Sequence, residues 1–187
     1  MARIIIGLTG PMVTGKGTVA EYLRENYQAS VYGFSGPLRD VLKRLHLSIV
    51  RENMAKLSEA LRSTFHQHLI SATIVHDIGE DDAEVIVLDG IRRPSDLEQA
   101  RALEGFVLIA VHAEQQTRHQ RLLKRSQNLD DQSKTLEAFQ ADEQAEADRE
   151  IPVVMAQAQH IIDNNHDIET LYRQVDALMQ RLRNQEI

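Results

Sequence analysis

The chain of 187 residues has 42% hydrophobic and 26% charged residues, values typical of a globular protein, which exclude a mainly disordered chain. It contains no cysteine, so disulfide frameworks, thiolate metal sites and cysteine nucleophiles are excluded. A net charge of −7 disfavours nucleic-acid binding, and no segment approaches the ~20 apolar residues of a membrane span. We expect one cytoplasmic domain over residues 1–187, a monomer or homodimer, with neither nucleic acid nor membrane as a partner.

The first part of the chain predicts a strand, a helix and a second strand. Residues 4–9 form a short apolar run, rich in β-branched side chains and closed by Gly10, as expected of a buried strand. Residues 19 to about 26 have helical spacing, and residues 30–33 form a second short strand. This β-α-β order indicates parallel strands joined by a helix.

Helical segments follow at residues 34–80, which we interpret as an insertion that binds the acceptor of a reaction. Pro37 suits the first turn of a helix that continues to Leu45, and residues 51–77 give a second helical stretch. Residues 85–88 then form a continuous apolar strand, as expected of a central parallel strand covered on both faces.

The second half of the chain repeats the alternation of strand and helix. The elements expected there are helices at 94–103, 114–126 and 168–183, strands at 106–111 and 161–163, and a polar, acid-rich segment at 127–150. We interpret this last segment as a possible lid or a solvated arm. Together the elements predict a three-layer α/β/α P-loop NTPase fold with a parallel central sheet and ligands at the carboxyl ends of its strands.

A phosphate-binding loop is the strongest motif. The segment from Gly10 to Lys16 has the glycine-x4-glycine-lysine spacing and lies between a strand and a helix, where main-chain N–H groups can surround a polyphosphate. Lys16 would bridge the terminal phosphates. Gly17 stands where a hydroxyl is usual, and Thr18 follows as a candidate contact to phosphate or metal. The residues of this segment expected to bind a nucleotide are Gly10, Val13, Thr14, Gly15, Lys16, Gly17 and Thr18.

Charged residues elsewhere offer further candidates. Asp89 ends a strand beside the loop strand, where a carboxylate can order Mg²⁺, although a turn role before Gly90 is the alternative. Arg118, Arg121 and Arg125 share one helix face, which can close over phosphates or be a solvated basic face. We favour the first interpretation in both cases.

Two motifs resemble the adenylate kinase family. Residues 15–18, Gly-Lys-Gly-Thr, resemble the loop variant of those kinases, and residues 88–94, Leu-Asp-Gly-Ile-Arg-Arg-Pro, are similar to a segment in which their arginine grips the acceptor phosphate. Residues 34–39 lie where that family has an acceptor-side helix with another such arginine. The resemblance implies ATP and Mg²⁺ as cofactors and places Asn164 and Asn165 near the nucleotide base, with a turn role as the alternative; Asn165 is the one we assign to nucleotide binding. It also implies an acceptor site formed by Arg39, Asp89, Arg92 and Arg93.

The chain departs from adenylate kinases at several points. Val13 replaces an inner glycine, Ile91 and Arg92 replace phenylalanine and proline, and residues 127–150 have no obvious match to an arginine-bearing lid. Residues 34–42, together with Arg51 and the pair Leu61-Arg62, also look like deoxynucleoside monophosphate kinases of the phage type. We therefore predict a relative of these kinases and not an adenylate kinase proper.

The predicted reaction is transfer of the terminal phosphoryl group of ATP to a nucleoside or deoxynucleoside monophosphate. Its catalytic residues would be Lys16, Asp89, Arg118 and Arg121, with Thr18 and Asp89 as metal ligands. Residues 161–165 are similar to the tail of dephospho-coenzyme A kinases, which makes that or another small-metabolite kinase the alternative. A second alternative is a nucleotide-binding regulator without efficient transfer.

Overall fold

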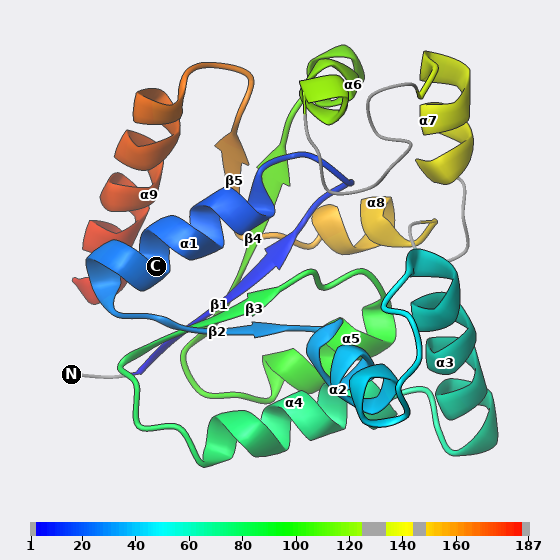
Figure 1. Ribbon diagram of the computed structural model, residues 1–187. Helices are drawn as coiled ribbons and strands as arrows, with labels where there is room; N and C mark the ends of the chain where they lie inside the picture. The colour runs from blue at the N-terminus through cyan, green and yellow to red at the C-terminus, as the bar shows by residue number, and fades with distance from the viewer. Residues whose placement is uncertain (1–2, 125–133, 144–148, 185–187) are drawn as a thin grey trace.

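The computed structural model describes residues 3–124, 134–143 and 149–184. Within them, five parallel strands form one sheet in the order β2-β3-β1-β4-β5, with helices on both faces (Figure 1). The strands are β1 (Ile4–Thr9), β2 (Ser30–Gly33), β3 (Val85–Asp89), β4 (Phe106–His112) and β5 (His160–Asp163). The three-layer α/β/α arrangement predicted from the sequence is confirmed.

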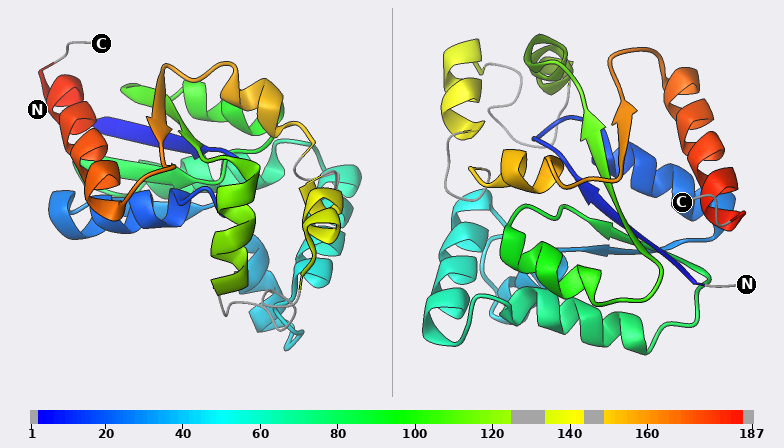
Figure 2. Two further views of the ribbon diagram at one scale, coloured as in Figure 1. Left: turned by 90° about the horizontal axis from the view of Figure 1, so that it is seen from above. Right: turned by 180° about the vertical axis from the view of Figure 1, so that it is seen from behind.

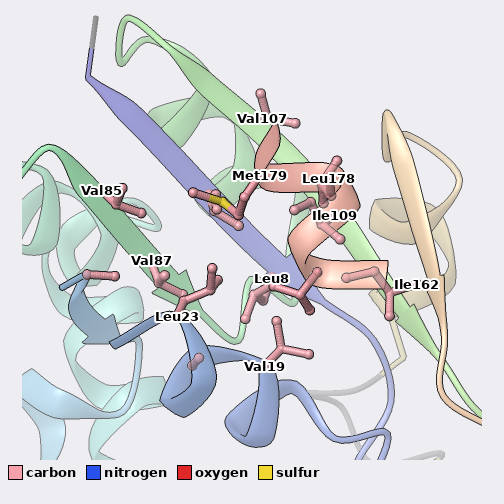
Figure 3. Packing of buried hydrophobic residues seen from close by; sticks show 14 of the residues in the cluster. Leu8, Val19, Leu23, Val85, Val87, Val107, Ile109, Ile162, Leu178 and Met179 are labelled. Carbon is pink, nitrogen blue, oxygen red and sulfur yellow. The ribbon is translucent and has the colours of Figure 1, made fainter. Parts of the chain in front are cut away.

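The central strands bury both faces, because alternate side chains face opposite layers. Ile6 belongs to a core between the sheet and the helices α1 (Lys16–Tyr27) and α9 (Ile168–Arg183) (Figure 3). Its neighbour Ile5 belongs to a second core on the other face, packed against α4 (Leu69–Gly79) and α5 (Pro94–Arg101). Burial on both sides explains why these strands are continuous apolar runs in the sequence.

The helical region after β2 divides into two parts with different roles. It contains α2 (Gly36–Arg44), α3 (Arg51–Thr64) and α4. The second stretch expected at 51–77 is two helices, because α3 ends at Thr64. Ile74 of α4 is 2% exposed and packs on the sheet, so α4 is the crossover helix that joins β2 to β3, while α2 and α3 extend from it.

The carboxyl ends of the strands lie together at one end of the molecule. Figure 2 shows α3, α6 (Gln115–Lys124) and α7 (Leu136–Glu143) at this end, opposite the amino terminus. Phe139 of α7 is fully buried, although its segment is polar and was expected to stand apart from the core. Its ring lies 5.6 Å from the ring of His119 in α6, so one aromatic side chain anchors α7.

Two features complete the fold. A short helix, α8 (Ile151–Met155), was not predicted from the sequence, and it buries Ile151 and Val154 before β5. Its five residues are too few for a helical repeat to be recognised. Among the described residues, no helix has both the length and the apolar character needed to cross a membrane.

Candidate functional site

The loop between β1 and α1 has a strained backbone. Gly10 has φ 143° and Gly15 has φ 98°, and a Cβ atom at Gly15 would lie 2.2 Å from Nδ2 of Asn164. Val13 has φ 61°, in the left-handed region that β-branched residues rarely adopt. Val13 therefore keeps a conformation suited to the glycine of the resembling kinases, and such strain is characteristic of functional loops.

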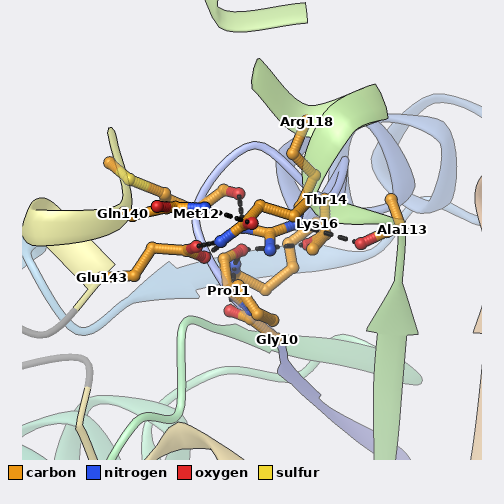
Figure 4. A network of polar contacts seen from close by, with 10 residues as sticks. Gly10, Pro11, Met12, Thr14, Lys16, Ala113, Arg118, Gln140 and Glu143 are labelled. Carbon is orange, nitrogen blue, oxygen red and sulfur yellow. Dashed lines mark hydrogen bonds and ion pairs between the residues drawn. The ribbon is translucent and has the colours of Figure 1, made fainter. Parts of the chain in front are cut away.

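The ammonium group of Lys16 lies inside this loop. Its Nζ atom donates hydrogen bonds to the carbonyl oxygens of Gly10, at 2.6 Å, and Pro11, at 2.8 Å (Figure 4). Thr14 is fully buried, and its Oγ1 atom also donates to the Pro11 carbonyl, at 3.1 Å. Because charged phosphate oxygens accept hydrogen bonds more strongly than carbonyls do, Lys16 is placed to exchange these contacts for a bound polyphosphate.

Helix α1 begins at the loop. Lys16 is its first residue, and Gly17 and Thr18 follow in the first turn, Gly17 exposed and Thr18 half-buried. The partial positive charge of a helix N-terminus favours anions. The loop, the lysine and the helix end thus offer three sources of positive potential at one place.

Asp89 lies at the carboxyl end of β3, beside the loop strand. It pairs in register with Leu8 of β1, and its Oδ1 atom is buried with no hydrogen-bond partner among the described residues. Burial raises the pKa of its carboxyl group, and the positive charges of Lys16 and Arg92 oppose this rise. The charges of Lys16 and Arg92 therefore both act on the Asp89 carboxylate.

The site fits a Mg²⁺ ion that is held mainly by phosphate and water. In the part of the chain that the structure describes, no cluster of three or more His, Cys, Asp or Glu side chains could bind a metal. Magnesium commonly uses one or two carboxylates together with substrate phosphates. The buried oxygen of Asp89 that lacks a partner is suited to this role, either directly or through a water molecule.

Arg118 of α6 reaches the loop from the opposite side. It is 6% exposed, and its Nε atom donates to the Ala113 carbonyl at 3.0 Å. Its Nη1 atom donates to the Met12 carbonyl at 3.4 Å and forms an ion pair with Glu143 of α7 (Figure 4). The guanidinium carbon lies 5.5 Å from the ring centroid of Phe139. Arg118 thus connects the loop, α6 and α7 through one side chain.

Arg121 lies one turn further along α6. Its Nη2 atom donates to Oδ1 of Asn164 at 3.4 Å, and its Nη1 atom is buried with no hydrogen-bond partner among the described residues. The structure therefore brings Arg118 and Arg121 to the same site, as their spacing predicted. Arg125, the third arginine of the predicted face, lies outside the described residues.

Of the two asparagines after β5, Asn164 contacts the loop. Its Nδ2 atom donates to the Thr14 carbonyl at 2.7 Å. The side chain of Asn165, the residue expected at the nucleotide, instead accepts from the main-chain N–H of Glu114 at 2.8 Å and donates to Asp163. Adjacent identical residues gave no signal in the sequence to distinguish them.

The structure separates the predicted acceptor-side arginines from one another. Arg92 is exposed, and its charge opposes the rise that burial causes in the pKa of Asp89. Burial likewise raises the pKa of Asp96, and the charge of Arg93 is among those that oppose this rise. Arg39 is exposed on α2, and its Nε atom donates to Oγ of Ser35 at 3.5 Å. The structure brings Arg92 to Asp89, and it places Arg39 on the neighbouring helix without a described contact to either.

A buried ion pair joins α3 to α5 near these arginines. Nη2 of Arg62 donates to the carboxylate of Asp96 at 3.0 and 3.2 Å, and the two residues are 7% and 3% exposed. Nη1 of Arg62 also donates to the Gln67 carbonyl. Sequence reasoning did not find this pair, because 34 residues separate its members and no local motif links them.

Comparison with known proteins agrees with this geometry. A sequence-family model described as an AAA domain matches residues 6–149. The UPF0200 protein of Sulfurisphaera tokodaii is 26% identical over 180 residues, which cover 95% of this chain and 97% of that protein. The UPF0200 protein of Methanocaldococcus jannaschii is 27% identical over 183 residues, 97% of this chain and 91% of that protein.

A solved structure shows the same architecture. Shikimate kinase from Bacteroides thetaiotaomicron superposes with a TM-score of 0.63 at 16% identity, covering 96% of this chain and 98% of that one. At this identity the likeness establishes the fold, which is the three-layer α/β/α fold of P-loop kinases. In this chain the loop around Lys16 joins the first strand of that fold to its first helix.

Proposed function

This chain belongs to the family described as AAA domain, and we propose that it is a Mg²⁺-dependent kinase that transfers the terminal phosphoryl group of ATP to a nucleoside or deoxynucleoside monophosphate. The supporting observation is the arrangement at the carboxyl ends of the neighbouring strands β1 and β3, where the loop with Lys16 follows β1, Asp89 ends β3 and Arg92 comes shortly after it. A lysine of the donor loop and an arginine beyond β3 act on the same buried carboxylate. A phosphoryl group passing between donor and acceptor needs positive charge on both sides.

Each side chain has a role that its position supports. Lys16 and the loop amides bind the donor phosphates, while Arg92, aided by Arg39, orients the acceptor phosphate by parallel hydrogen bonds. Arg121, whose Nη1 atom is buried without a described partner, neutralises charge on the transferring group. Asp89, whose buried Oδ1 atom has no partner among the described residues, would hold a magnesium ion directly or through water, and that ion would supply further neutralisation of the phosphate charge.

The bond changes are those of a direct displacement. An oxygen of the acceptor forms a bond to the γ-phosphorus of ATP, and the bond from that phosphorus to the β,γ-bridging oxygen breaks, leaving ADP. A monophosphate acceptor needs little help from a base, since its second pKa near 6 leaves it mostly dianionic at neutral pH. The positioning side chains are therefore sufficient for this class of acceptor.

A hydroxyl acceptor is the second candidate, which two observations favour. The similar structure named shikimate kinase acts, by its name, on shikimate, and residues 161–165 resemble dephospho-coenzyme A kinases. A hydroxyl must lose its proton, and Asp89, whose pKa is raised by burial, is placed where a base would be needed. The acceptor class therefore decides whether Asp89 acts on a metal or on a proton.

An acceptor panel tests the proposal. Purified protein with MgATP is supplied with nucleoside and deoxynucleoside monophosphates, dephospho-coenzyme A and shikimate, and ADP release is measured together with the mass of the product. We expect turnover with at least one monophosphate. Turnover only on a hydroxyl acceptor would contradict the first candidate and support the second, and nucleotide binding without any transfer would support the regulator.

Two variants separate the donor side from the acceptor side. Lys16→Ala should nearly abolish transfer in a folded protein, because it removes the charge inside the loop. Arg92→Ala should chiefly raise the KM of the acceptor, by roughly tenfold or more, as expected for a lost charged hydrogen bond. Arg24→Ala is the matched control, since Arg24 pairs with Glu21 on the exposed surface of α1. An Arg92→Ala effect confined to ATP would reassign that residue to the donor.

A further inference from the structure

The segment that follows β5 is anchored firmly beneath the phosphate loop. The main-chain N–H of Asn164 donates to the His112 carbonyl at 2.7 Å, which ties the segment to the carboxyl end of β4. Asn164 is 6% exposed. A buried amide side chain must form its hydrogen bonds inside the protein, and both of its polar atoms do so.

The two ends of the Asn164 amide contact different parts of the site. Nδ2 donates to the carbonyl oxygen of Thr14 inside the loop at 2.7 Å. Oδ1 accepts from Nη2 of Arg121 on α6 at 3.4 Å. The amide therefore bridges the loop that binds the donor phosphates and an arginine that approaches them from another helix.

The close fit of Asn164 against the loop explains part of the motif. A Cβ atom at Gly15 would lie 2.2 Å from Nδ2, so the loop can approach the amide only because residue 15 is glycine. Arg121 is held by one nitrogen, and its other terminal nitrogen, Nη1, is buried with no partner in the described part of the chain. A guanidinium group held in this way presents its remaining donors to an anion.

We propose that Asn164 is a positioning residue that couples the conformation of the phosphate loop to the orientation of Arg121, so that both are set before a nucleotide binds. Asn164 acts through its two partners and contacts no phosphate itself. The proposal rests on the proposed function only as far as nucleotide binding, since transfer is not required for it. Loss of the Asn164 side chain should therefore weaken nucleotide affinity by more than the accompanying loss of stability explains.

The primary test measures affinity and stability together. The dissociation constants of MgATP and MgADP are measured by calorimetry, and thermal unfolding is followed in the absence of nucleotide. Asn164→Ala should weaken both affinities by roughly tenfold, the size expected when a hydrogen bond to a charged group and one to the loop are lost. Asn164→Ser, which retains a smaller polar group, provides the same readouts if the alanine variant does not fold.

A matched control distinguishes positioning from structural support. Gln174 of α9 accepts from the main-chain N–H of Asp163 at 3.0 Å and donates to its carbonyl at 2.8 Å. It therefore supports the same segment, through the residue before Asn164. Gln174→Ala should lower the unfolding temperature while the nucleotide affinities stay within twofold of wild type. If the Asn164 variants behave in the same way as this control, the proposal is wrong.

A double-mutant cycle tests whether Asn164 acts through the arginine. Because Arg121 is held by Asn164, the loss of affinity in the double variant Asn164→Ala/Arg121→Ala should be smaller than the product of the two single losses. Independent, multiplicative losses would contradict the coupling. A wild-type protein that binds nucleotide but transfers nothing would refute the proposed kinase and leave this test valid, whereas absence of nucleotide binding would refute both.

Discussion

The position of Asp89 is unfavourable for stability but suited to a role in the candidate site. Its carboxylate stands at the end of a buried strand, where Oδ1 has no hydrogen-bond partner among the described residues. Burial favours the protonated form and raises the pKa of the carboxyl group despite the nearby charges of Lys16 and Arg92. A buried carboxylate that lowers the unfolding free energy at the carboxyl end of a central strand is typical of a functional site.

Replacement of this carboxylate should therefore separate stability from activity. The pKa of Asp89 is higher in the folded protein than in the unfolded chain, where it is near 3.8. Protonation of Asp89 therefore stabilises the fold fully below the unfolded-state pKa, and this stabilisation is lost as pH rises through the folded-state pKa. At pH 7 we expect the unfolding free energy of Asp89→Asn to exceed that of wild type by roughly 1–3 kcal/mol, so that the variant unfolds at a higher urea concentration. Transfer should fall by at least two orders of magnitude, roughly the size of the loss when one electrostatic contact to the transition state is removed.

The measurement is urea unfolding between pH 3.5 and 8 with EDTA and without nucleotide. The difference in unfolding free energy between Asp89→Asn and wild type should increase as pH rises. Asp167 offers a control of opposite sign, because its carboxylate accepts from the main-chain N–H of Thr170, which lowers its pKa. Asp167→Ala should lose stability at neutral pH and little at acid pH. An Asp89→Asn protein less stable than wild type at pH 7 would contradict this account of the site.

The sequence identified the charged residues of the site better than the neutral ones. Lys16 and Asp89 were predictable because each belongs to a motif with fixed local spacing, and Arg121 because helical periodicity places it beside Arg118. Asn164 was not distinguishable from its neighbour, since only the register of β4 with β5 decides which asparagine faces the loop. The strain at Val13 was visible only as a departure from the glycine of the resembling kinases.

Among the helices, α3 is held to the rest of the molecule by charge as well as by apolar packing. The Arg62–Asp96 pair is buried at both ends and links α3 to α5, next to the segment that carries Arg92 and Arg93. A buried ion pair adds little net stability, but the loss of one member leaves the other as an uncompensated charge. The pair is therefore suited to fixing the position of α3 relative to the acceptor arginines.

We expect a strong coupling between these two residues. Arg62→Met and Asp96→Leu should each lower the unfolding free energy by about 3–5 kcal/mol, because each leaves a buried charge without its ion-pair partner. The double variant should lose much less than the sum of the two. Urea unfolding of the four proteins at neutral pH measures the interaction, and Lys56→Met, which removes an exposed pair with Glu52 on α3, is the control. Additive losses would show that the pair does not act as a unit.

Helix α7 contributes a charge that competes for the site. Glu143 pairs with Arg118 and also accepts from Nε2 of Gln115 at 2.8 Å. The side chain of Arg118 is therefore engaged by a carboxylate of this protein at the place where donor phosphates are expected. A phosphate that binds Arg118 must displace that carboxylate.

Neutralising this competitor should strengthen nucleotide binding. We expect Glu143→Gln to lower the dissociation constant of MgATP about three- to tenfold, since a charged partner of Arg118 becomes a neutral one. Glu137→Gln is the matched control, because it makes the same change of net charge on the same helix at an exposed position. Calorimetric titration of wild type and the two variants with MgATP measures the three dissociation constants. Weaker binding in Glu143→Gln would show instead that the Glu143 carboxylate holds Arg118 in the orientation that binds nucleotide.

The elements themselves were predicted with unequal success for a physical reason. The strands β1, β3 and β4 are continuous apolar runs, and the helix α9 repeats one hydrophobic period over its whole length, so their positions agree with the sequence prediction. The helix α8 and the anchoring of α7 depend on only one or two buried apolar side chains each, Ile151 and Val154 in α8 and Phe139 in α7. A pattern of one or two apolar residues does not reveal which distant surface will cover them.

On the scale of the whole molecule, the candidate site lies at the carboxyl ends of the central strands of the sheet. The strands β1 and β3 are buried on both faces, and they deliver the loop and Asp89 to one end. Around that end stand α6 with its arginines and, near Asp89, the segment that carries Arg92 (Figure 2). Ligands bound there would join parts of the chain that are distant in sequence.

Bound ligand should consequently stabilise the molecule as a unit. A nucleotide at 100 times its dissociation constant adds about 2.7 kcal/mol to the unfolding free energy if it binds only the folded state, which raises the melting temperature of a chain of this size by roughly 5–10 °C. Lys16→Ala should gain almost nothing from the same MgATP concentration, because the ammonium group inside the phosphate loop is removed, and its melting temperature without nucleotide provides the baseline for this comparison. Thermal unfolding with a non-hydrolysable ATP analogue, with and without a monophosphate, measures both effects. A second rise on addition of the monophosphate, absent in Arg92→Ala, would show that the acceptor binds at the end of β3, and an equal rise in that variant would place it elsewhere.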